Sequence, residues 1–181
     1  MRHGTGTALL ALAIVGATSG MATAAEDTTC SYDRRTKRVS LDIGRASSAM
    51  IYVWKGTIQI SASSLNDQCG RATTRNTDSI FVTATPEFSE YLTIDLGNGP
   101  LAPGSAKETG LREIEISVDL GGTQGFFSEE LIIEGTPQSD TFAIGQDGIS
   151  LNGDSDADLR YVSHVNEPRI KLAGEGGGDT I

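Results

Sequence analysis

The chain has 181 residues and a formal net charge of −10 at pH 7, and this length suits roughly one domain. The charge is uneven, because residues 25–75 carry 8 basic and 5 acidic side chains whereas residues 76–181 carry 5 basic and 19 acidic ones. Such an acidic segment repels phosphate backbones, which argues against nucleic acid as a partner and favours a cation. A solvated acidic surface without a ligand is the alternative.

The first 24 residues have the pattern of a secretory signal peptide. Arg2 supplies a basic start, residues 8–17 are mostly apolar, and Ala22 and Ala24 frame a small-residue cleavage site. The apolar stretch is too short to span a bilayer, and no later stretch approaches about 20 apolar residues. We therefore expect a secreted, extracellular protein that is not inserted in a membrane after signal cleavage.

The chain has two cysteines, Cys30 and Cys69. Export would place them where disulfides form and persist, so the sequence predicts a Cys30–Cys69 bridge. A metal-binding pair or a reactive thiol is the alternative, but no His or Cys flanks either residue. The bridge would staple a β cap region, residues 25–75, and stabilise it by roughly 3 to 4 kcal/mol.

Alternating apolar and polar residues predict β-strands early in the mature chain. The alternation covers residues 39–43 and 57–61, and residues 51–54 followed by Lys55-Gly56 and residues 57–61 predict a hairpin. No window after residue 25 carries the sustained three-and-four apolar spacing of a helix. We therefore expect a nearly all-β protein.

Weak internal repeats run through residues 76–181. Three segments pass from an apolar strand to an acidic residue and a glycine: YLTIDLGNG from Tyr91, IEISVDLGG from Ile114 and ELIIEGTPQ from Glu130. Steps of about 20 residues favour a right-handed parallel β-solenoid or β-roll, in which every coil contributes a strand and a turn. A β-sandwich of antiparallel hairpins is the alternative.

The final segment, GEGGGDTI, matches most of the nonapeptide G-G-x-G-x-D-x-U-x, where U is a large apolar residue. Gly174, Gly177, Asp179 and Ile181 occupy its first, fourth, sixth and eighth positions. On these residues the chain resembles the hemolysin-type calcium-binding repeat proteins, or RTX proteins, whose repeats form a parallel β-roll or β-helix. The resemblance implies Ca²⁺ bound by turn carbonyls, which glycine allows to face inward, and by the Asp carboxylate.

Two degenerate copies of the nonapeptide precede this one. GTPQSDTF keeps Gly135, Asp140 and the apolar Phe142, whereas GDSDADLR keeps Gly153 and Asp158. In the family that the chain resembles, neighbouring coils share each ion. The resemblance therefore implies that the turns of these copies hold calcium together with the last one, and that the repeats continue past residue 181.

Three alternate carboxylates in the middle copy, Asp154, Asp156 and Asp158, are further candidate calcium ligands. Such a triplet also opens an EF-hand loop, but that loop needs Gly at its sixth position and Glu at its twelfth. Counted from Asp154, these positions hold Leu159 and Val165. The sequence therefore excludes an EF-hand and leaves either a repeat turn that contacts calcium or a solvated acidic loop.

A second resemblance covers the front of the mature chain. CGRATTRNTDSIFV, residues 69–82, together with the upstream Cys30 looks like the opening module of exported bacterial proteins that carry such repeats further on. Both resemblances imply the N-terminal part of a secreted calcium-binding repeat protein with a structural or adhesive role. Calcium would order its C-terminal turns, and a cell-surface or extracellular polysaccharide is a candidate partner.

The alternative function is the N-terminal part of a β-helical enzyme that degrades polysaccharides. It requires a basic residue beside carboxylates, and the candidates are Arg112, Arg160, Arg169 and Lys171. His164 is the only histidine after residue 24, and its neighbour Ser163 would point to the opposite face of a strand, so the two do not form part of a catalytic triad. We assign no catalytic residue.

Overall fold

The computed structural model describes residues 27–45, 47–84, 89–107, 111–121, 129–162 and 169–181. The expected signal peptide, Ser163 and His164 lie outside these residues. The described part of the chain contains thirteen strands: β1 (Thr29–Asp33), β2 (Arg38–Ile43), β3 (Ser48–Trp54), β4 (Thr57–Ala62), β5 (Asn66–Thr73), β6 (Ser79–Ala84), β7 (Tyr91–Asp95), β8 (Glu115–Asp119), β9 (Glu130–Glu134), β10 (Ala143–Ile144), β11 (Ile149–Ser150), β12 (Leu159–Val162) and β13 (Arg169–Ala173). Among these residues, no helix is long and apolar enough to cross a bilayer.

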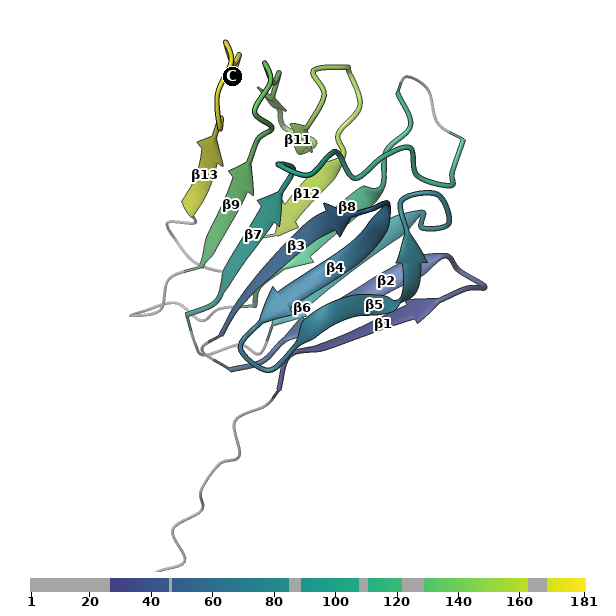
Figure 1. The fold of residues 1–181 in the computed structure, drawn as a ribbon. Coiled ribbons are helices and arrows are strands. Elements are labelled where there is room, and N and C mark those ends of the chain that lie inside the picture. The colour runs from purple at the N-terminus through teal and green to yellow at the C-terminus, as the bar shows by residue number, and fades with distance from the viewer. Residues whose placement is uncertain (1–26, 46, 85–88, 108–110, 122–128, 163–168) are drawn as a thin grey trace, which may run out of the picture.

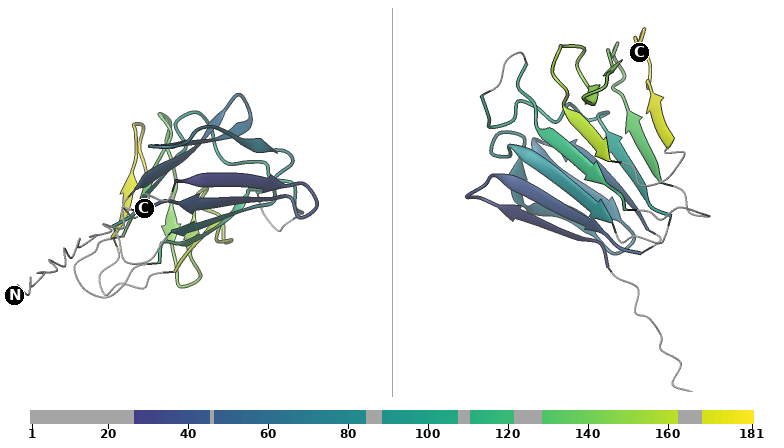
Figure 2. Two further views of the ribbon diagram at one scale, coloured as in Figure 1. Left: turned by 90° about the horizontal axis from the view of Figure 1, so that it is seen from below. Right: turned by 180° about the vertical axis from the view of Figure 1, so that it is seen from behind.

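The strands form two sheets that pack face to face around one core (Figures 1 and 2). The seven-stranded sheet has the order β1-β2-β6-β8-β12-β11-β10, and the six-stranded sheet has the order β13-β9-β7-β3-β4-β5. The expected all-β class is confirmed. The apolar alternation in the sequence explains it, because each strand turns one apolar face to the opposite sheet.

The chain alternates between the two sheets in four rounds, in which β2, β6, β8 and β12 are each followed by a strand of the other sheet: β3, β7, β9 and β13. Corresponding strands of successive rounds pair in parallel, as β2 pairs with β6 and β7 with β9. Tyr91 pairs with Glu130, and Glu130 with Arg169, so the later rounds repeat every 39 residues. The 20-residue step expected from the sequence is therefore about half a round.

The predicted parallel solenoid is wrong as a description of the sheets, which are mixed. Each sheet has four parallel strands, and antiparallel strands extend them. In the seven-stranded sheet these are β1 at one edge and β11 and β10 at the other, and in the six-stranded sheet they are β4 and β5 at one edge. A tight turn causes the reversal between β3 and β4. Lys55 and Gly56 have φ of 49° and 77°, as a two-residue hairpin turn requires, and this confirms the predicted hairpin. The alternative, a β-sandwich of antiparallel hairpins, agrees with the structure in its two packed sheets but not in strand direction, since the central strands are parallel.

Inward side chains stack in rows across the parallel strands, because residues in register point to the same face. One row of the seven-stranded sheet is Val39, Ile80, Ile116 and Leu159, and one row of the six-stranded sheet is Ile51, Ile94, Ile133 and Leu172. All of them are buried except Leu172, which is half-buried. Strands from both sides of residue 75, the expected domain boundary, share both sheets and this core.

The predicted disulfide between Cys30 and Cys69 is confirmed, with the two Cα atoms 5.5 Å apart. It joins β1 at the edge of one sheet to β5 at the edge of the other. The bridge therefore closes the end of the molecule at which the first round lies.

Candidate functional site

The first and the last copy of the nonapeptide lie directly against each other. Their strands, β9 and β13, pair in parallel, and the backbone N–H of Gly135 donates to the carbonyl of Ala173 at 2.7 Å. At the far end of the copies the N–H of Thr180 donates to the carbonyl of Asp140 at 2.9 Å. Both copies thus follow equivalent strands and stay in register from the first glycine to the aspartate.

The aspartates of the two copies come together in neighbouring rounds. Asp179 Oδ1 accepts a hydrogen bond from the backbone N–H of Asp140 at 3.1 Å. The carboxylate of Asp140 accepts bonds from the N–H of Thr136 at 2.7 Å and from its hydroxyl at 3.0 Å. Asp140 is half-buried and Asp179 is exposed. The structure therefore places the two predicted ligands side by side, each folded back into its own turn.

The glycines at the first position of each copy are explained by this fold-back. A Cβ on Gly135 would lie 2.5 Å from Asp140 Oδ2, and a Cβ on Gly174 would overlap the carboxylate of Asp179. Gly177 has a second reason, since its φ is 76° and a Cβ there would lie 2.6 Å from the backbone of the first copy. At the glycine positions of the motif, a carboxylate or the backbone of the other copy thus lies so close that a side chain would not fit.

Oxygen atoms of the first copy lie close to the glycines of the last copy. A Cβ on Gly176 would lie 3.3 Å from the carbonyl oxygen of Pro137, and one on Gly177 would lie 2.8 Å from that of Gln138. Ser139 Oγ accepts a bond from the N–H of Gly178 at 3.0 Å. Carbonyl, hydroxyl and carboxylate oxygens are what calcium requires, in sets of six to eight at flexible geometry. The two turns therefore contain oxygen atoms of the kinds that bind hard cations.

The middle copy takes no part in this stack. It connects β11 to β12 within the seven-stranded sheet, whereas the other two copies follow strands of the six-stranded sheet. Asp158 is buried and its Oδ2 accepts a bond from the N–H of Leu151 at 2.6 Å. A Cβ on Gly153 would overlap the side chain of Thr141. Gly153 and Asp158 thus hold this loop in shape.

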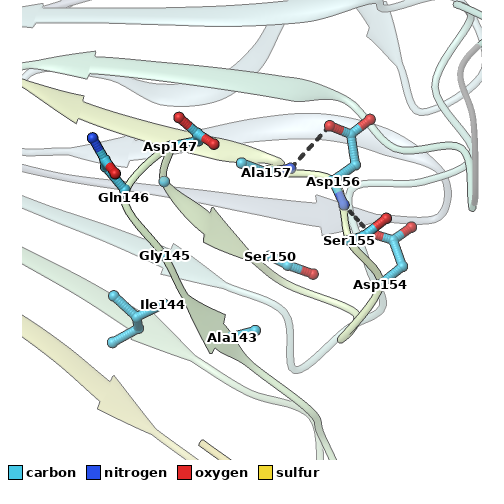
Figure 3. Close-up of a pocket in the computed structure, with 11 residues that line it drawn as sticks. Ala143, Ile144, Gly145, Gln146, Asp147, Ser150, Asp154, Ser155, Asp156 and Ala157 are labelled. Carbon is cyan, nitrogen blue, oxygen red and sulfur yellow. Dashed lines mark hydrogen bonds between the residues drawn. The ribbon is translucent and has the colours of Figure 1, made fainter.

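Asp154 and Asp156 face a pocket of about 160 Å³ that they share with Asp147 (Figure 3). Asp154 Oδ1 accepts from the N–H of Asp156 at 2.8 Å, and Asp156 Oδ1 accepts from the N–H of Ala157 at 3.0 Å. Within the described ranges, no group of three or more His, Cys, Asp or Glu side chains is arranged to hold a metal ion. A cation in either place would therefore depend on backbone oxygens as well.

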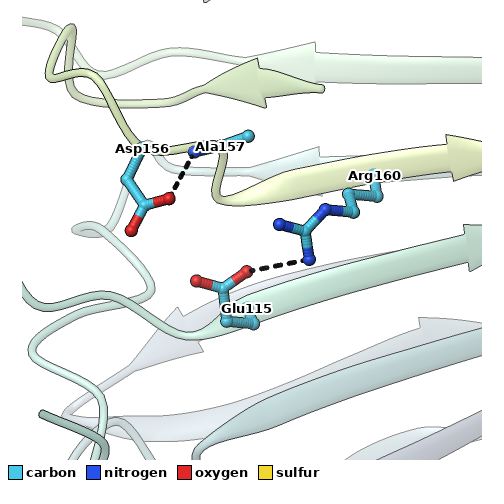
Figure 4. A network of polar contacts seen from close by, with 4 residues as sticks. All are labelled: Glu115, Asp156, Ala157 and Arg160. Atoms are coloured by element: carbon cyan, nitrogen blue, oxygen red, sulfur yellow. Dashed lines mark hydrogen bonds and ion pairs between the residues drawn. The ribbon is translucent and has the colours of Figure 1, made fainter. Parts of the chain in front are cut away.

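The basic residues considered for catalysis are spread over the molecule. Arg160 lies on β12 and forms a 4.0 Å ion pair with Glu115 on β8 (Figure 4). Arg169 and Lys171 are exposed on β13 in the other sheet, and Arg112 is exposed in the segment before β8. Among the described residues, Arg160 is the one of these four that forms an ion pair with a carboxylate.

Sequence reasoning missed a groove on the outer face of the seven-stranded sheet. It has a volume of about 340 Å³, and its lining includes Phe81, Thr83, Ser117, Asp119, Arg160 and Val162. A signal was present, because Phe81 and Val162 are apolar residues at positions where the alternation of β6 and β12 calls for outward, polar ones.

A second missed feature is a pair of buried glutamates. Glu90 and Glu129 directly precede β7 and β9, and both are fully buried. They lie in neighbouring rounds, because the N–H of Glu130 donates to the carbonyl of Glu90 at 3.2 Å. Tyr161 donates its hydroxyl to Glu129 Oε2 at 2.8 Å. The sequence signal was the repeat Ser-Glu-x-Leu-x-Ile, which occurs at residues 89–94 and 128–133. These carboxylates mark equivalent corners of successive rounds.

No family model, curated protein or solved structure matches this chain. The resemblance to RTX proteins therefore rests on the residues quoted above, and membership of that family stays a prediction.

Proposed function

We propose that the protein is a secreted calcium-binding repeat module in which calcium orders the turns after β9 and β13. The observation that carries the proposal is the in-register stacking of the first and last copies, which puts Asp140 and Asp179 in neighbouring rounds. The two carboxylates would hold the ion with the carbonyl oxygens of Pro137 and Gln138. The positive charge of calcium would offset the repulsion between the carboxylates of Asp140 and Asp179, which the stacked turns bring into neighbouring rounds.

Two further properties support this function. Residues 76–181 carry 19 acidic and 5 basic side chains, so a divalent cation bound there also relieves repulsion within the segment. The Cys30–Cys69 disulfide suits an oxidising compartment outside the cytoplasm. A structural or adhesive role follows from a module whose last turns become rigid only where calcium is abundant, because binding energy that depends on the folded turn is also folding energy.

The test is a calorimetric titration of the chelator-treated protein with calcium chloride. We expect saturable binding that Asp179→Asn weakens at least tenfold, because it removes a ligand charge. Glu175→Gln is the matched control, since it removes the same charge from the same turn at a motif position that supplies no side-chain ligand, and it should weaken binding by less than threefold.

The double variant Asp154→Asn, Asp156→Asn distinguishes the two acidic places. Binding that survives this change but not Asp179→Asn supports the stacked turns. Binding that is lost only in the double variant would move the ion to the pocket beside β11. Absence of saturable binding in the unaltered protein would refute the calcium proposal.

A further inference from the structure

The outer groove of the seven-stranded sheet has a shape that follows from strand register. Phe81, Ser117 and Arg160 stand in one row across β6, β8 and β12. Neighbouring strands are about 4.8 Å apart, so the backbones under Phe81 and Arg160 are roughly 10 Å apart. The short side chain of Ser117 between them leaves an open channel. The next row repeats the pattern, with Thr83 and Val162 on either side of Asp119.

Phe81 forms one wall of this groove. Its side chain is 42 % exposed, and the guanidinium of Arg38 lies 4.9 Å from the ring centroid. Arg38 belongs to β2, on the opposite side of β6 from β8 and β12. The cation therefore packs on the ring from the β2 side, and the ring also lines the groove.

Polar groups complete the lining. Arg160 is more than half exposed and its ion pair with Glu115 is long, at 4.0 Å, so its guanidinium keeps donors for a ligand. Ser117 and Asp119 line the groove from β8, its middle strand, and Asp119 Oδ1 accepts a hydrogen bond from the N–H of Gly121 at 3.0 Å. Thr83 lines it from β6, and its hydroxyl donates to Asp42 Oδ1 on β2 at 3.4 Å. An aromatic wall, an aliphatic residue and a few fixed hydrogen-bonding groups are the usual composition of a small-ligand site.

We propose that this groove binds one pyranose ring of an extracellular polysaccharide. A pyranose has an apolar face of C–H groups, which would pack against Phe81, and an edge of hydroxyls, which would bond Arg160, Asp119 and Ser117. The volume of about 340 Å³ is at the lower end of small-ligand pockets. A protein partner would need a far wider contact, of roughly 800 Å² on each side, and an apolar centre with few charges.

Neutral sugars and uronic acids both have an apolar ring face and hydroxyl groups, so both could bind in the groove. The interaction with Arg160 distinguishes the two classes. A uronate carboxylate would form a charge-assisted pair with the guanidinium, whereas a neutral ring would use it only as a hydroxyl donor. The proposal does not depend on calcium at the stacked turns, which lie at the ends of β9 and β13 in the other sheet.

The test is native electrophoresis of the protein in gels that contain either hydroxyethylcellulose, a neutral polymer, or polygalacturonate, a polymer of uronic acid. We expect at least one polymer to retard the unaltered protein. Phe81→Ala should weaken the binding roughly tenfold, because it removes the stacking wall. Tyr91→Ala is the matched control, since Tyr91 is an aromatic residue of similar exposure, 39 %, on the other sheet, and it should bind as the unaltered protein does.

Arg160→Gln and its control Arg169→Gln identify the sugar class. If Arg160→Gln loses binding to polygalacturonate and Arg169→Gln does not, the ligand is a uronate. If hydroxyethylcellulose retards the unaltered protein and Arg160→Gln binds this polymer only somewhat more weakly, the ligand is a neutral ring. Circular dichroism melts show that the variants are folded. The proposal is overturned if neither polymer retards the protein, or if Phe81→Ala and Tyr91→Ala lose binding equally.

Discussion

The first three rounds and the last round share the same register but differ in burial. Ala49, Leu92, Leu131 and Ile170 occupy one row of the six-stranded sheet. The exposed fractions of the first three side chains are 3 %, 0 % and 0 %, whereas that of Ile170 is 40 %. In the first round β4 lies beyond β3 and the disulfide closes the sheet edges, while β13 is the last strand of its sheet in the described part of the chain.

This contrast shows that an apolar side chain in this row is buried only where another strand of the sheet lies on each side of its own strand. Each round alone has two strands and cannot bury its own apolar residues, so it takes stability from the rounds beside it. The last round also carries the glycine-rich turn and neighbouring acidic groups. On the calcium proposal, we therefore expect a bound cation to change the order of this round more than that of the others.

Removal of the disulfide should have the largest effect. Replacing both Cys30 and Cys69 with serine opens a loop of 39 residues and should lower the free energy of unfolding by roughly 3 to 4 kcal/mol. Urea unfolding followed by tryptophan fluorescence measures it, because Trp54 lies at the end of β3 in the stapled region. A loss below about 1 kcal/mol would mean that the bridge is not what holds the first round closed.

A pair of core truncations compares the rounds within one row. Ile94 is fully buried and Leu172 only half-buried, so Ile94→Ala should cost about 3 kcal/mol and Leu172→Ala about 1 kcal/mol. Chemical denaturation of both variants gives the difference. Equal costs would show that the last round is as well packed as the second.

A pair of glycine substitutions tests the fold-back of Asp179 onto Gly174, with a smaller expected effect. Gly174→Ala places a Cβ on the carboxylate of Asp179, whereas the nearest atom to a Cβ on Gly178 is Ser139 Oγ at 3.8 Å. We expect Gly174→Ala to lower stability by about 1 kcal/mol and to weaken calcium binding, with Gly178→Ala near neutral on both. Thermal melts with and without calcium check this. Equal effects of the two substitutions would contradict the fold-back of Asp179 onto Gly174.

The sequence indicated strands, faces and the tight hairpin well. The alternation around Ile58 and Ile60 and the turn at Lys55-Gly56 predicted β3, β4 and their pairing. Period-two patterns specify which residues face inward but not which strand lies alongside, because any strand with the same alternation fits. The parallel pairing of β2 with β6, 41 residues away in register, and the mixed character of both sheets were for this reason not predictable.

The candidate site was predictable where local geometry governs it. The nonapeptide spacing aligned Gly135 with Gly174 and Asp140 with Asp179 in the sequence, but it did not show that the first and last copies lie side by side while the middle copy lies in the other sheet. It could not show that Asp158 turns into the protein to hold Leu151, since the same residue types serve loops and metal sites. The groove at Phe81 was missed because it needs three strands from distant parts of the sequence.

The most direct test of the account is amide hydrogen exchange with calcium and with a chelator. The N–H groups of Gly178 and Thr180 bond the last copy to the first, on Ser139 Oγ and the carbonyl of Asp140. We expect calcium to slow exchange at both amides at least tenfold and to leave amides of the stapled β3 unchanged. Equal exchange in calcium and chelator at Gly178 and Thr180 would contradict the claim that calcium orders these turns.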